Sequence, residues 1–320
     1  MNTRYLAPLV CALLGLAARA QTPSNVAPPP DLAKNPAPVL APLDPKLPTI
    51  FIAGDSTAAR GKGEHQQGWA VPFADYFDPA KVNIANRARG GRSSKTFILE
   101  GAWDQLLADV KAGDIVLIQF GHNDSSPVAE AASVPRGQWR FRGSLPGLGD
   151  ETQEIDNPLT NKHETVHTFG WYMRKMIDDV KAKGATPVVL SPTVRNRWQD
   201  GKIERGPGPY REWSYEVAKA AAVPFFDLSS RMAEKFEALG QEKTKALYEQ
   251  DFVHFDLAGA DLHAVTVVAG LKGLRLKSFD SYLSPKGHAI EADRMAWLRL
   301  PAGASPTLPS LALYLRADKS

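Results

Sequence analysis

Four polar residues with complementary chemistry stand in short stretches spread along the chain. Ser56 lies in GDST, Asn123 lies in GHND, and Asp251 and His254 share DFVH. A serine hydroxyl becomes a nucleophile when an imidazole removes its proton and a carboxylate orients that imidazole. An amide, together with backbone N–H groups beside the glycines of RARGGRSS at residues 87–94, can donate hydrogen bonds to a developing oxyanion. These are the residue types that acyl transfer requires.

Each stretch also has a purely structural interpretation when it stands alone. A serine at a strand-to-helix turn is often a helix N-cap, and an asparagine after a strand is often part of an Asx turn. The glycine pair could be a plain turn, and Asp251 with His254 could be an exposed loop pair. The acyl-transfer hypothesis therefore depends on all four stretches meeting at one place.

A different chemistry is indicated by HETVHTFG at residues 163–170, which fits the H-E-x-x-H signature of zinc peptidases. Such a site needs the motif on a helix and a third ligand, and the longer metzincin form needs a histidine where Met173 stands. The residues before His163 are typical of a loop, and the helical pattern begins near Thr168. The sequence therefore predicts no metal site, and acyl transfer by the residues above requires no organic cofactor.

Short apolar runs precede the candidate residues and predict the strands that position them. Runs that are apolar on both faces are typical of parallel strands covered by helices on each side. The expected strands are 49–54, 82–88, 114–121, 186–192 and 223–228, and helical patterns cover about 100–112, 168–183, 209–222, 230–240 and 256–271. This alternation predicts a three-layer α/β/α sandwich with a central parallel sheet, of the flavodoxin-like doubly wound class. Sites in such folds lie at the carboxyl ends of the strands, where the candidate residues fall.

The N-terminus has the features of a secretory signal peptide at residues 1–20. Arg4 precedes an apolar run, and ARA at residues 18–20 forms an A-x-A cleavage site. The run is short for a membrane span, although a short membrane anchor is the alternative. Cys11, the only cysteine, lies in this segment, so we expect a mature chain without disulfides or cysteine metal ligands. We expect a secreted or periplasmic protein with no membrane attachment after cleavage.

The rest of the chain divides by composition. Residues 21–46 are rich in proline and predict a linker. Residues 47–275 hold the alternating elements and form the predicted catalytic domain, and residues 276–320 are treated as a C-terminal extension. Within the domain, residues 125–166 are polar and rich in glycine and proline, which predicts a long loop. The formal net charge of +3 and the lack of a long basic run argue against a nucleic-acid partner, and the sequence assigns no oligomeric state.

The four stretches resemble the sequence blocks of the SGNH, or GDSL-like, hydrolases, a family named for its Ser, Gly, Asn and His. The wider stretches AGDST, GWAVPFADYF, GGRSSKTF, VLIQFGHND and HTFGWYMRKMI resemble the rhamnogalacturonan acetylesterases within it. The similarity extends over about residues 47–274. It implies a serine esterase that removes O-acetyl groups from a pectic polysaccharide, on the SGNH-hydrolase fold.

The resemblance also implies roles for individual residues. Ser56 is the expected nucleophile, His254 the base and Asp251 its orienting partner. The expected oxyanion hole consists of the backbone N–H groups of Ser56 and Gly91 with the side chain of Asn123. The residues on either side of His254 depart from the family pattern, so the acyl group and substrate could differ from those of the relatives.

The substrate partner, an acetylated polysaccharide or oligosaccharide, is a less specific expectation. Aromatic rings stack on sugars, and arginines pair with carboxylates such as those of galacturonate. The expected contacts are Arg92, Trp139, His167, Trp171 and Tyr172, with Arg87, Arg89, Arg136, Arg140 and Arg142 as further cations. The structural alternatives are solvated surface for the arginines and core packing for the rings. The functional alternatives are an acetylesterase for xylan or another glycan, a short-chain lipase-like esterase, and a non-catalytic carbohydrate-binding protein.

Overall fold

The computed structural model describes residues 42–130, 133–135, 138 and 140–293. The predicted signal peptide at 1–20, most of the predicted linker at 21–46 and the candidate contact Trp139 lie outside the described residues. Export therefore stays a prediction. Within the described residues, no helix combines the length and apolar character that crossing a membrane requires.

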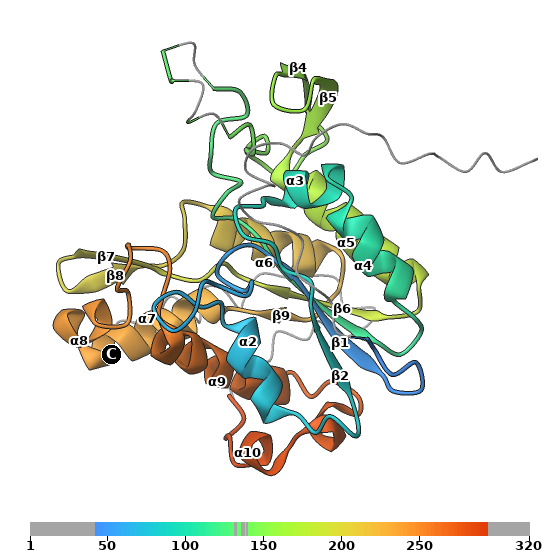
Figure 1. Ribbon diagram of the computed structural model, residues 1–320, viewed down its shortest axis with the longest axis vertical. Helices are drawn as coiled ribbons and strands as arrows, with labels where there is room; N and C mark the ends of the chain where they lie inside the picture. The colour runs from blue at the N-terminus through green and yellow to red at the C-terminus, as the bar shows by residue number, and fades with distance from the viewer. Residues whose placement is uncertain (1–41, 131–132, 136–137, 139, 294–320) are drawn as a thin grey trace, which may run out of the picture.

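A parallel sheet of five strands runs through the centre of the described chain, in the order β2-β1-β3-β6-β9 (Figure 1). Its strands are β1 (Thr49–Gly54), β2 (Asn83–Asn86), β3 (Ile115–Gln119), β6 (Thr186–Leu190) and β9 (Phe225–Phe226). Ile52 of β1 pairs with Asn86 of β2 on one side and with Leu117 of β3 on the other. This is the strand order of flavodoxin-like folds, which bind ligands at the carboxyl ends of the strands where the winding direction reverses. The predicted fold class is confirmed.

Alternate residues of the central strands face opposite layers. In β1, Ile50 and Ile52 pack into one hydrophobic cluster, and Phe51 and Ala53 pack into another on the opposite face. Every residue of β1 and of β3 is buried. A strand covered on both faces gains stability from an apolar side chain at each position. The central strands are therefore continuous apolar runs in the sequence.

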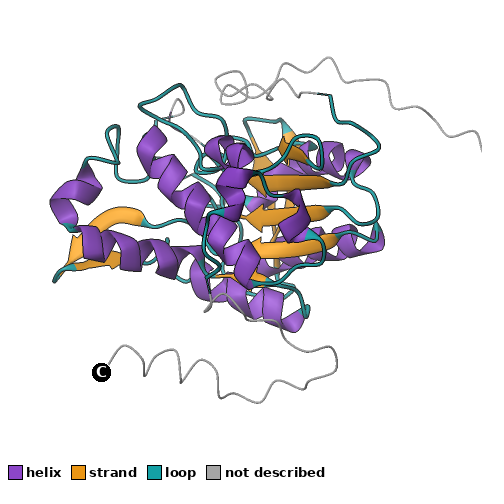
Figure 2. Cartoon of the chain, turned by 90° about the horizontal axis from the view of Figure 1, so that it is seen from below, coloured by secondary structure: helices purple, strands orange, loops and turns teal. Residues whose placement is uncertain are grey.

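Helices cover both faces of the sheet and complete the three layers (Figures 1 and 2). On one face lie α2 (Ala70–Phe73), α7 (Leu228–Leu239) and α9 (Leu257–Gly273), with the short η1 (Ala74–Tyr76) after α2 and α8 (Gln241–Lys245) after α7. On the other face lie α3 (Ser94–Leu99), α4 (Ala102–Asp109), α5 (Phe169–Ala182) and α6 (Tyr210–Ala220). Thr168 caps α5 by accepting a hydrogen bond from the backbone N–H of Trp171. The helix therefore begins where the sequence predicts it.

Two β-hairpins that the sequence analysis missed follow β3 and β6. Strand β4 (Thr152–Asn157) pairs with β5 (Lys162–His167), and β7 (Arg195–Gln199) pairs with β8 (Lys202–Glu204), both antiparallel. In Figure 1 the first hairpin projects beside α3 and the second lies near α7 and α8. Their strands are largely polar and exposed, so they lack the apolar runs that identify the sheet strands. The prediction of a loop throughout residues 125–166 is wrong for this reason.

The chain after residue 275, which we expected to be an extension, continues to pack on the domain as far as residue 293. Phe279, in the short helix η3 (Phe279–Tyr282), and Leu283 are buried in the cluster beneath α9. Ser284 caps α10 (Pro285–His288), and its backbone N–H donates to the carbonyl of Tyr76 at 3.0 Å. Residues 276–293 therefore share the core of the domain.

Candidate active site

Ser56, His254 and Asp251 form a continuous chain of hydrogen bonds. Nε2 of His254 lies 2.8 Å from Oγ of Ser56, and Nδ1 of His254 lies 2.7 Å from Oδ2 of Asp251. Ser56 and His254 are 198 positions apart in the sequence, so only the fold brings them together. When Nδ1 carries the proton and donates to Asp251, Nε2 is the acceptor for the serine hydroxyl. The arrangement can therefore remove the hydroxyl proton as the serine oxygen attacks a carbonyl.

The turn after β1 carries Ser56 at the carboxyl edge of the sheet. Asp55 is buried and accepts hydrogen bonds from the backbone N–H and the hydroxyl of Thr57, both at 2.8 Å. Burial raises the pKa of Asp55, while these two hydrogen bonds and the charge of Arg195 act in the opposite direction. The turn that carries the serine is thus fixed from inside the protein.

The side chain of Asn123 is held in one orientation by its neighbours. Nδ2 of Asn123 donates to the carbonyl of Arg92 at 3.0 Å. The guanidinium of Arg142 donates to Oδ1 of Asn123 at 2.7 Å and to the carbonyl of Gly91 at 3.1 Å. These contacts define Oδ1 as the acceptor end of the amide, which leaves the second hydrogen of Nδ2 for another acceptor. Arg142 is therefore a support of this site, although the sequence grouped it with possible substrate contacts.

Gly91 adopts a backbone conformation that favours glycine, with φ of 75°. A Cβ at this position would lie 3.1 Å from Nη1 of Arg142, so a side chain would also disturb that contact. Within the described residues, the backbone N–H groups of Gly91 and Ser56 do not donate to a protein acceptor. Together with the amide of Asn123, they are a set of donors suited to an oxyanion.

Asp124 joins the loop after β2 to the loop after β3. Its buried carboxylate accepts hydrogen bonds from the backbone N–H of Ser94 at 3.1 Å and from the Ser94 hydroxyl at 2.5 Å. Burial raises the pKa of Asp124 to about 6, although the hydrogen bonds from Ser94 lower it. The residue after Ser94, Lys95, has a side chain only 1% exposed and pairs with Glu164 on β5 at 3.1 Å. The loop that carries Gly91 is thus anchored in the interior.

The Asp251–His254 loop is held largely by hydrogen bonds within itself. Oδ1 of Asp251 accepts from the backbone N–H groups of Val253 at 2.6 Å and His254 at 2.7 Å. Partial burial raises the pKa of Asp251, but hydrogen bonds from the His254 ring and from these N–H groups outweigh it and hold the pKa below its usual value. The carboxylate is therefore ionised where it faces the imidazole.

The β7–β8 hairpin supports the same loop from outside. The backbone N–H of Asn196 donates to the carbonyl of Phe252 at 2.7 Å, and the hydroxyl of Tyr248 donates to the carbonyl of Val194 at 3.3 Å. The guanidinium carbon of Arg197 lies 3.9 Å from the centroid of the Phe252 ring. The position of the imidazole thus depends on an element that the sequence did not reveal.

Comparison with known proteins agrees with this geometry. A sequence model of the GDSL-like Lipase/Acylhydrolase family matches residues 52–262. The chain belongs to this family. It is 34% identical over 218 residues to a rhamnogalacturonan acetylesterase of Emericella nidulans, a match that covers 68% of this chain and 81% of that protein. It is 29% identical to the rhamnogalacturonan acetylesterase RhgT of Bacillus subtilis, over 74% of this chain and 95% of that protein.

The solved structure of YxiM from Bacillus subtilis has the same fold, with a TM-score of 0.57 and 26% sequence identity. The superposition covers 74% of this chain and 59% of that one. The predicted resemblance to GDSL-like hydrolases is confirmed. This chain is accordingly a carboxylic ester hydrolase.

In this hydrolase the H-E-x-x-H stretch is part of a β-hairpin. His163 and His167 both lie on β5, where side chains four residues apart are about 13 Å apart, too far to share one ion. Glu164 is paired with Lys95, and His163 contacts Asp156 at 2.8 Å. Among the described residues, no group of three His, Cys, Asp or Glu side chains is arranged to hold a metal. The residues before His163, predicted to form a loop, belong to β4, the hairpin turn at 158–161 and the first residue of β5.

Two of the expected substrate contacts lie in the interior instead. Arg92 is 1% exposed and its Nε donates to Glu100 at 2.8 Å, and Tyr172 is fully buried with its hydroxyl accepting from the backbone N–H of His167. The interpretation of these two residues as sugar contacts is wrong, because the core already covers them. His167 and Trp171 are partly exposed and stack with ring centroids 3.7 Å apart, so they stay candidates.

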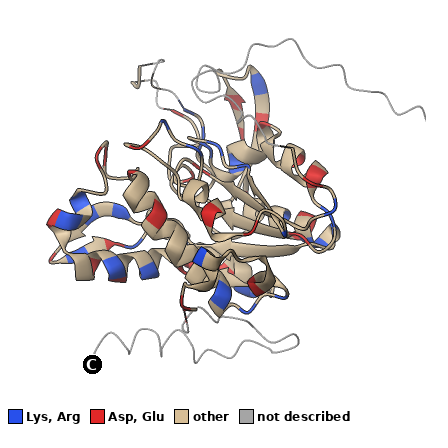
Figure 3. Ribbon diagram, turned by 60° about the horizontal axis from the view of Figure 1, so that its bottom comes forward, with Lys and Arg blue, Asp and Glu red and all other residues tan. Residues whose placement is uncertain are grey.

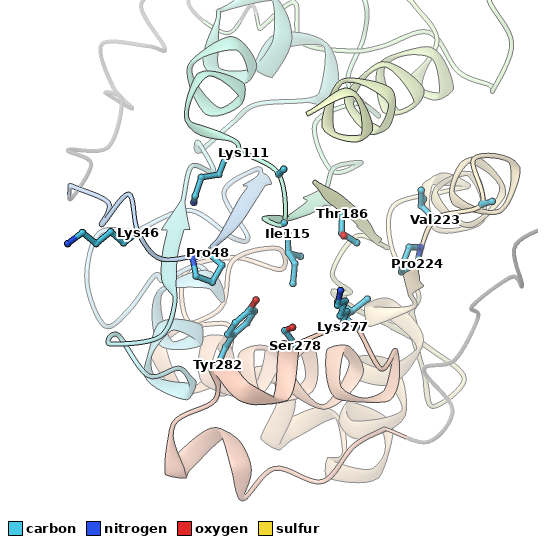
Figure 4. Close-up of a pocket in the computed structure, with 14 residues that line it drawn as sticks. Lys46, Pro48, Lys111, Ile115, Thr186, Val223, Pro224, Lys277, Ser278 and Tyr282 are labelled. Carbon is cyan, nitrogen blue, oxygen red and sulfur yellow. The ribbon is translucent and has the colours of Figure 1, made fainter. Parts of the chain in front are cut away.

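A cavity of about 830 Å³ lies at the opposite, amino-terminal edge of the sheet (Figure 4). Ile115 and Thr186, the first residues of β3 and β6, line it together with Lys111, Lys277 and Tyr282. None of its lining residues belongs to the triad or to the loops that carry the oxyanion donors. The cavity is therefore separate from the hydrogen-bonded chain of Ser56, His254 and Asp251 at the carboxyl edge.

Proposed function

We propose that this hydrolase removes O-acetyl groups from a pectic polysaccharide, rhamnogalacturonan, through an acetyl-enzyme formed on Ser56. The proposal rests on one observation above all, the hydrogen-bonded chain from Ser56 through His254 to Asp251, with distances of 2.8 and 2.7 Å. The names of the two relatives that match most of the chain support the choice of substrate. A carbohydrate-binding protein without catalysis would have no use for this chain of contacts.

In the first half-reaction, Oγ of Ser56 attacks the acetyl carbonyl carbon while Nε2 of His254 takes the hydroxyl proton. The carbonyl oxygen becomes an oxyanion in a tetrahedral intermediate. When the intermediate collapses, the bond to the sugar oxygen breaks and His254 gives its proton to that oxygen. The products are a free sugar hydroxyl and an acetyl-enzyme. Asp251 stays ionised throughout and stabilises the imidazolium that forms in between.

The oxyanion is bound by three donors, the backbone N–H groups of Ser56 and Gly91 and the Nδ2 of Asn123. Arg142 keeps the amide of Asn123 turned so that Nδ2 is its donor end. Its charge next to these donors also favours a developing negative oxygen. The donors are fixed before the reaction begins, so little reorganisation is needed as the charge develops.

In the second half-reaction, water replaces the sugar. His254 takes a proton from the water as its oxygen attacks the acetyl carbon, and the same donors bind the oxyanion again. The bond to Oγ then breaks and His254 returns the proton to Ser56. Acetate leaves and the enzyme is restored, so the cycle consumes one water for each acetyl group removed.

Acetate release from acetylated rhamnogalacturonan and from acetylated xylan tests the proposal, with wild type and Ser56→Ala compared in parallel. We expect release from the pectic polymer by wild type and none by the variant. Preference for xylan would keep the mechanism and overturn the substrate. Release that survives Ser56→Ala would overturn the nucleophile, and no release from either polymer by wild type would favour a binding protein.

We also propose that the protein is exported and that residues 1–20 are removed. The proposal is supported by the apolar run and the ARA cleavage site at residues 18–20. Sequencing the N-terminus of protein recovered from the periplasm or the medium tests it. The expected first residue is Gln21, and an intact N-terminus on membrane-bound protein would instead support the anchor alternative.

A further inference from the structure

Two arginines on β7 place positive charge beside the edge that carries the triad. Arg195 and Arg197 both lie on β7, within a stretch where the pairing with β8 is irregular. They share one nearby carboxylate, Glu204, at 4.0 Å from Arg195 and 3.9 Å from Arg197, the outer limit of an ion pair. Burial lowers the pKa of Arg195 and the nearby charge of Arg197 lowers it further, while the charges of Glu204 and Asp55 raise it. Arg195 therefore has Asp55 as a second nearby carboxylate, whereas Arg197 has Glu204 at the outer limit of an ion pair.

Arg197 stands directly beside the catalytic loop. Its guanidinium carbon lies 3.9 Å from the ring centroid of Phe252, a residue that comes between Asp251 and His254 in the chain. The side chain of Arg197 is 53% exposed, and Phe252 is 40% exposed. Phe252 is one of few large apolar side chains that the described residues leave this open to solvent. A cation and an exposed ring thus lie at the loop that carries Asp251 and His254.

Arg197 differs in its surroundings from the arginines that the sequence predicted as substrate contacts. The guanidinium of Arg92 is buried against Glu100, and that of Arg87 donates to Asp109 at 2.7 Å. Figure 3 shows that basic and acidic residues are interspersed over the described chain. Arg197 is therefore an exposed cation in direct contact with the Asp251–His254 loop.

We propose that Arg197 and Phe252 form a subsite for the uronate residue of the polymer next to the acetyl group that is removed. The planar guanidinium binds the uronate carboxylate through paired hydrogen bonds, and the Phe252 ring packs against the sugar ring. Arg195, whose side chain is only 17% exposed, adds favourable potential without direct contact. The inference rests on the proposed function, since it names the sugar that the same site would recognise.

Inhibition by unacetylated oligogalacturonate tests the subsite without requiring a polymeric substrate. The enzyme hydrolyses 4-nitrophenyl acetate while oligogalacturonate, or neutral xylo-oligosaccharide as the control ligand, is added. We expect oligogalacturonate to inhibit wild type competitively, and Arg197→Gln to raise its inhibition constant about tenfold, as expected for the loss of one charge-assisted contact. The KM for 4-nitrophenyl acetate should change much less than the inhibition constant, because that ester carries no carboxylate.

Two further variants separate recognition from support of the loop. Arg197→Lys keeps the charge and should recover part of the affinity, and Arg275→Gln, an exposed arginine after α9, should match wild type in both measurements. No inhibition of wild type by oligogalacturonate, or an equal inhibition constant in Arg197→Gln, would overturn the subsite. Loss of turnover in Arg197→Gln without a change in the inhibition constant would show that Arg197 only supports the loop.

Failure of the proposed function gives a different pattern of results. An enzyme that releases no acetate from acetylated rhamnogalacturonan, yet loses oligogalacturonate inhibition on Arg197→Gln, would keep the uronate subsite and reject the polymer. An enzyme that releases acetate from this polymer with a KM unaffected by Arg197→Gln would keep the polymer and reject the subsite.

Discussion

The two halves of the catalytic edge are held in place by different means. The half that carries Ser56 and the proposed oxyanion donors follows buried strands, and it is anchored by interior groups such as Asp124 and Lys95. The half that carries the base is a loop whose side chains reach solvent, with His254 24% and Asp251 41% exposed. Hydrogen bonds within the loop and the β7–β8 hairpin hold it.

This difference indicates whether a substitution in each half should change stability, rate or both. A charged group buried in the interior loses much of its stabilisation when its partner is removed, because water cannot replace that partner. An exposed pair is solvated in either case, so its loss affects stability little. We therefore expect the buried half to respond in stability as well as in rate, and the exposed half to respond in rate alone.

The largest expected effect on kcat comes from substitution of Ser56 in one half or His254 in the other. Ser56→Ala and His254→Ala should each lower kcat on 4-nitrophenyl acetate by about 10⁴- to 10⁶-fold, because the residues act as one unit. The double variant should be no slower than either single variant. Multiplicative effects in the double variant would show that the two halves work independently and would contradict the triad.

The two halves should differ most clearly in how far a substitution lowers the free energy of unfolding. Glu164→Gln removes the ion-pair partner of the buried ammonium of Lys95 and should lower the free energy of unfolding by about 3–5 kcal/mol. Asp251→Asn should lower it by about 1 kcal/mol or less, while reducing kcat on the order of 10⁴-fold through loss of the correct imidazole tautomer. Urea denaturation of both variants checks the contrast, and equal losses of stability would remove the distinction between the halves.

Within the buried half, substitutions of Asn123 and Arg142 should have non-additive effects on kcat, because Arg142 acts through the Asn123 amide. Asn123→Ala should raise the barrier by about 2.7–4 kcal/mol through loss of an oxyanion donor, with little change in KM. Arg142→Met should lower kcat about tenfold, because the amide remains but is no longer oriented. Added to Asn123→Ala, the arginine change should have no further effect on kcat. An additive result would assign Arg142 a role independent of the amide.

The last expected effect, which requires no loss of activity, is the dependence of stability on pH at Asp124. Its pKa is about 6 in the folded protein against an ordinary value of 3.8, so the folded state binds more protons between these pH values. The stabilisation from its protonated form is complete below about pH 4 and is lost as the pH rises through about 6, a change of about 3 kcal/mol. The variant Asp124→Asn should lack this dependence of stability on pH.

Comparing the two proteins removes the opposite contribution of buried histidines such as His263, whose depressed pKa of about 4 costs stability as the pH falls below 6.5. The measurement is the difference in unfolding free energy between wild type and Asp124→Asn from pH 4 to 7. A difference that does not change with pH would mean that the Asp124 carboxyl titrates normally.

The sequence predicted the sheet well because burial leaves a clear pattern. The strands that end before Ser56 and Asn123 are covered on both faces, so their residues are apolar without interruption. The loop Asp251–His254 was predictable too, because its hydrogen bonds join residues at most three positions apart. Both hairpins were missed, since polar strands exposed to solvent carry no comparable pattern.

The sequence by itself determined which groups could react and which of them follow the strands of the sheet. Apolar strand patterns and short-range hydrogen bonds both depend on residues that are close together in the sequence. Only the tertiary structure decided which charges serve the site. It buried Arg92, turned Glu164 into a partner for Lys95, and brought Arg142 to Asn123 and Arg197 to Phe252. Arg142 reaches Gly91 across 51 positions, and a contact of that range depends on how loops cross in space rather than on the residues beside it.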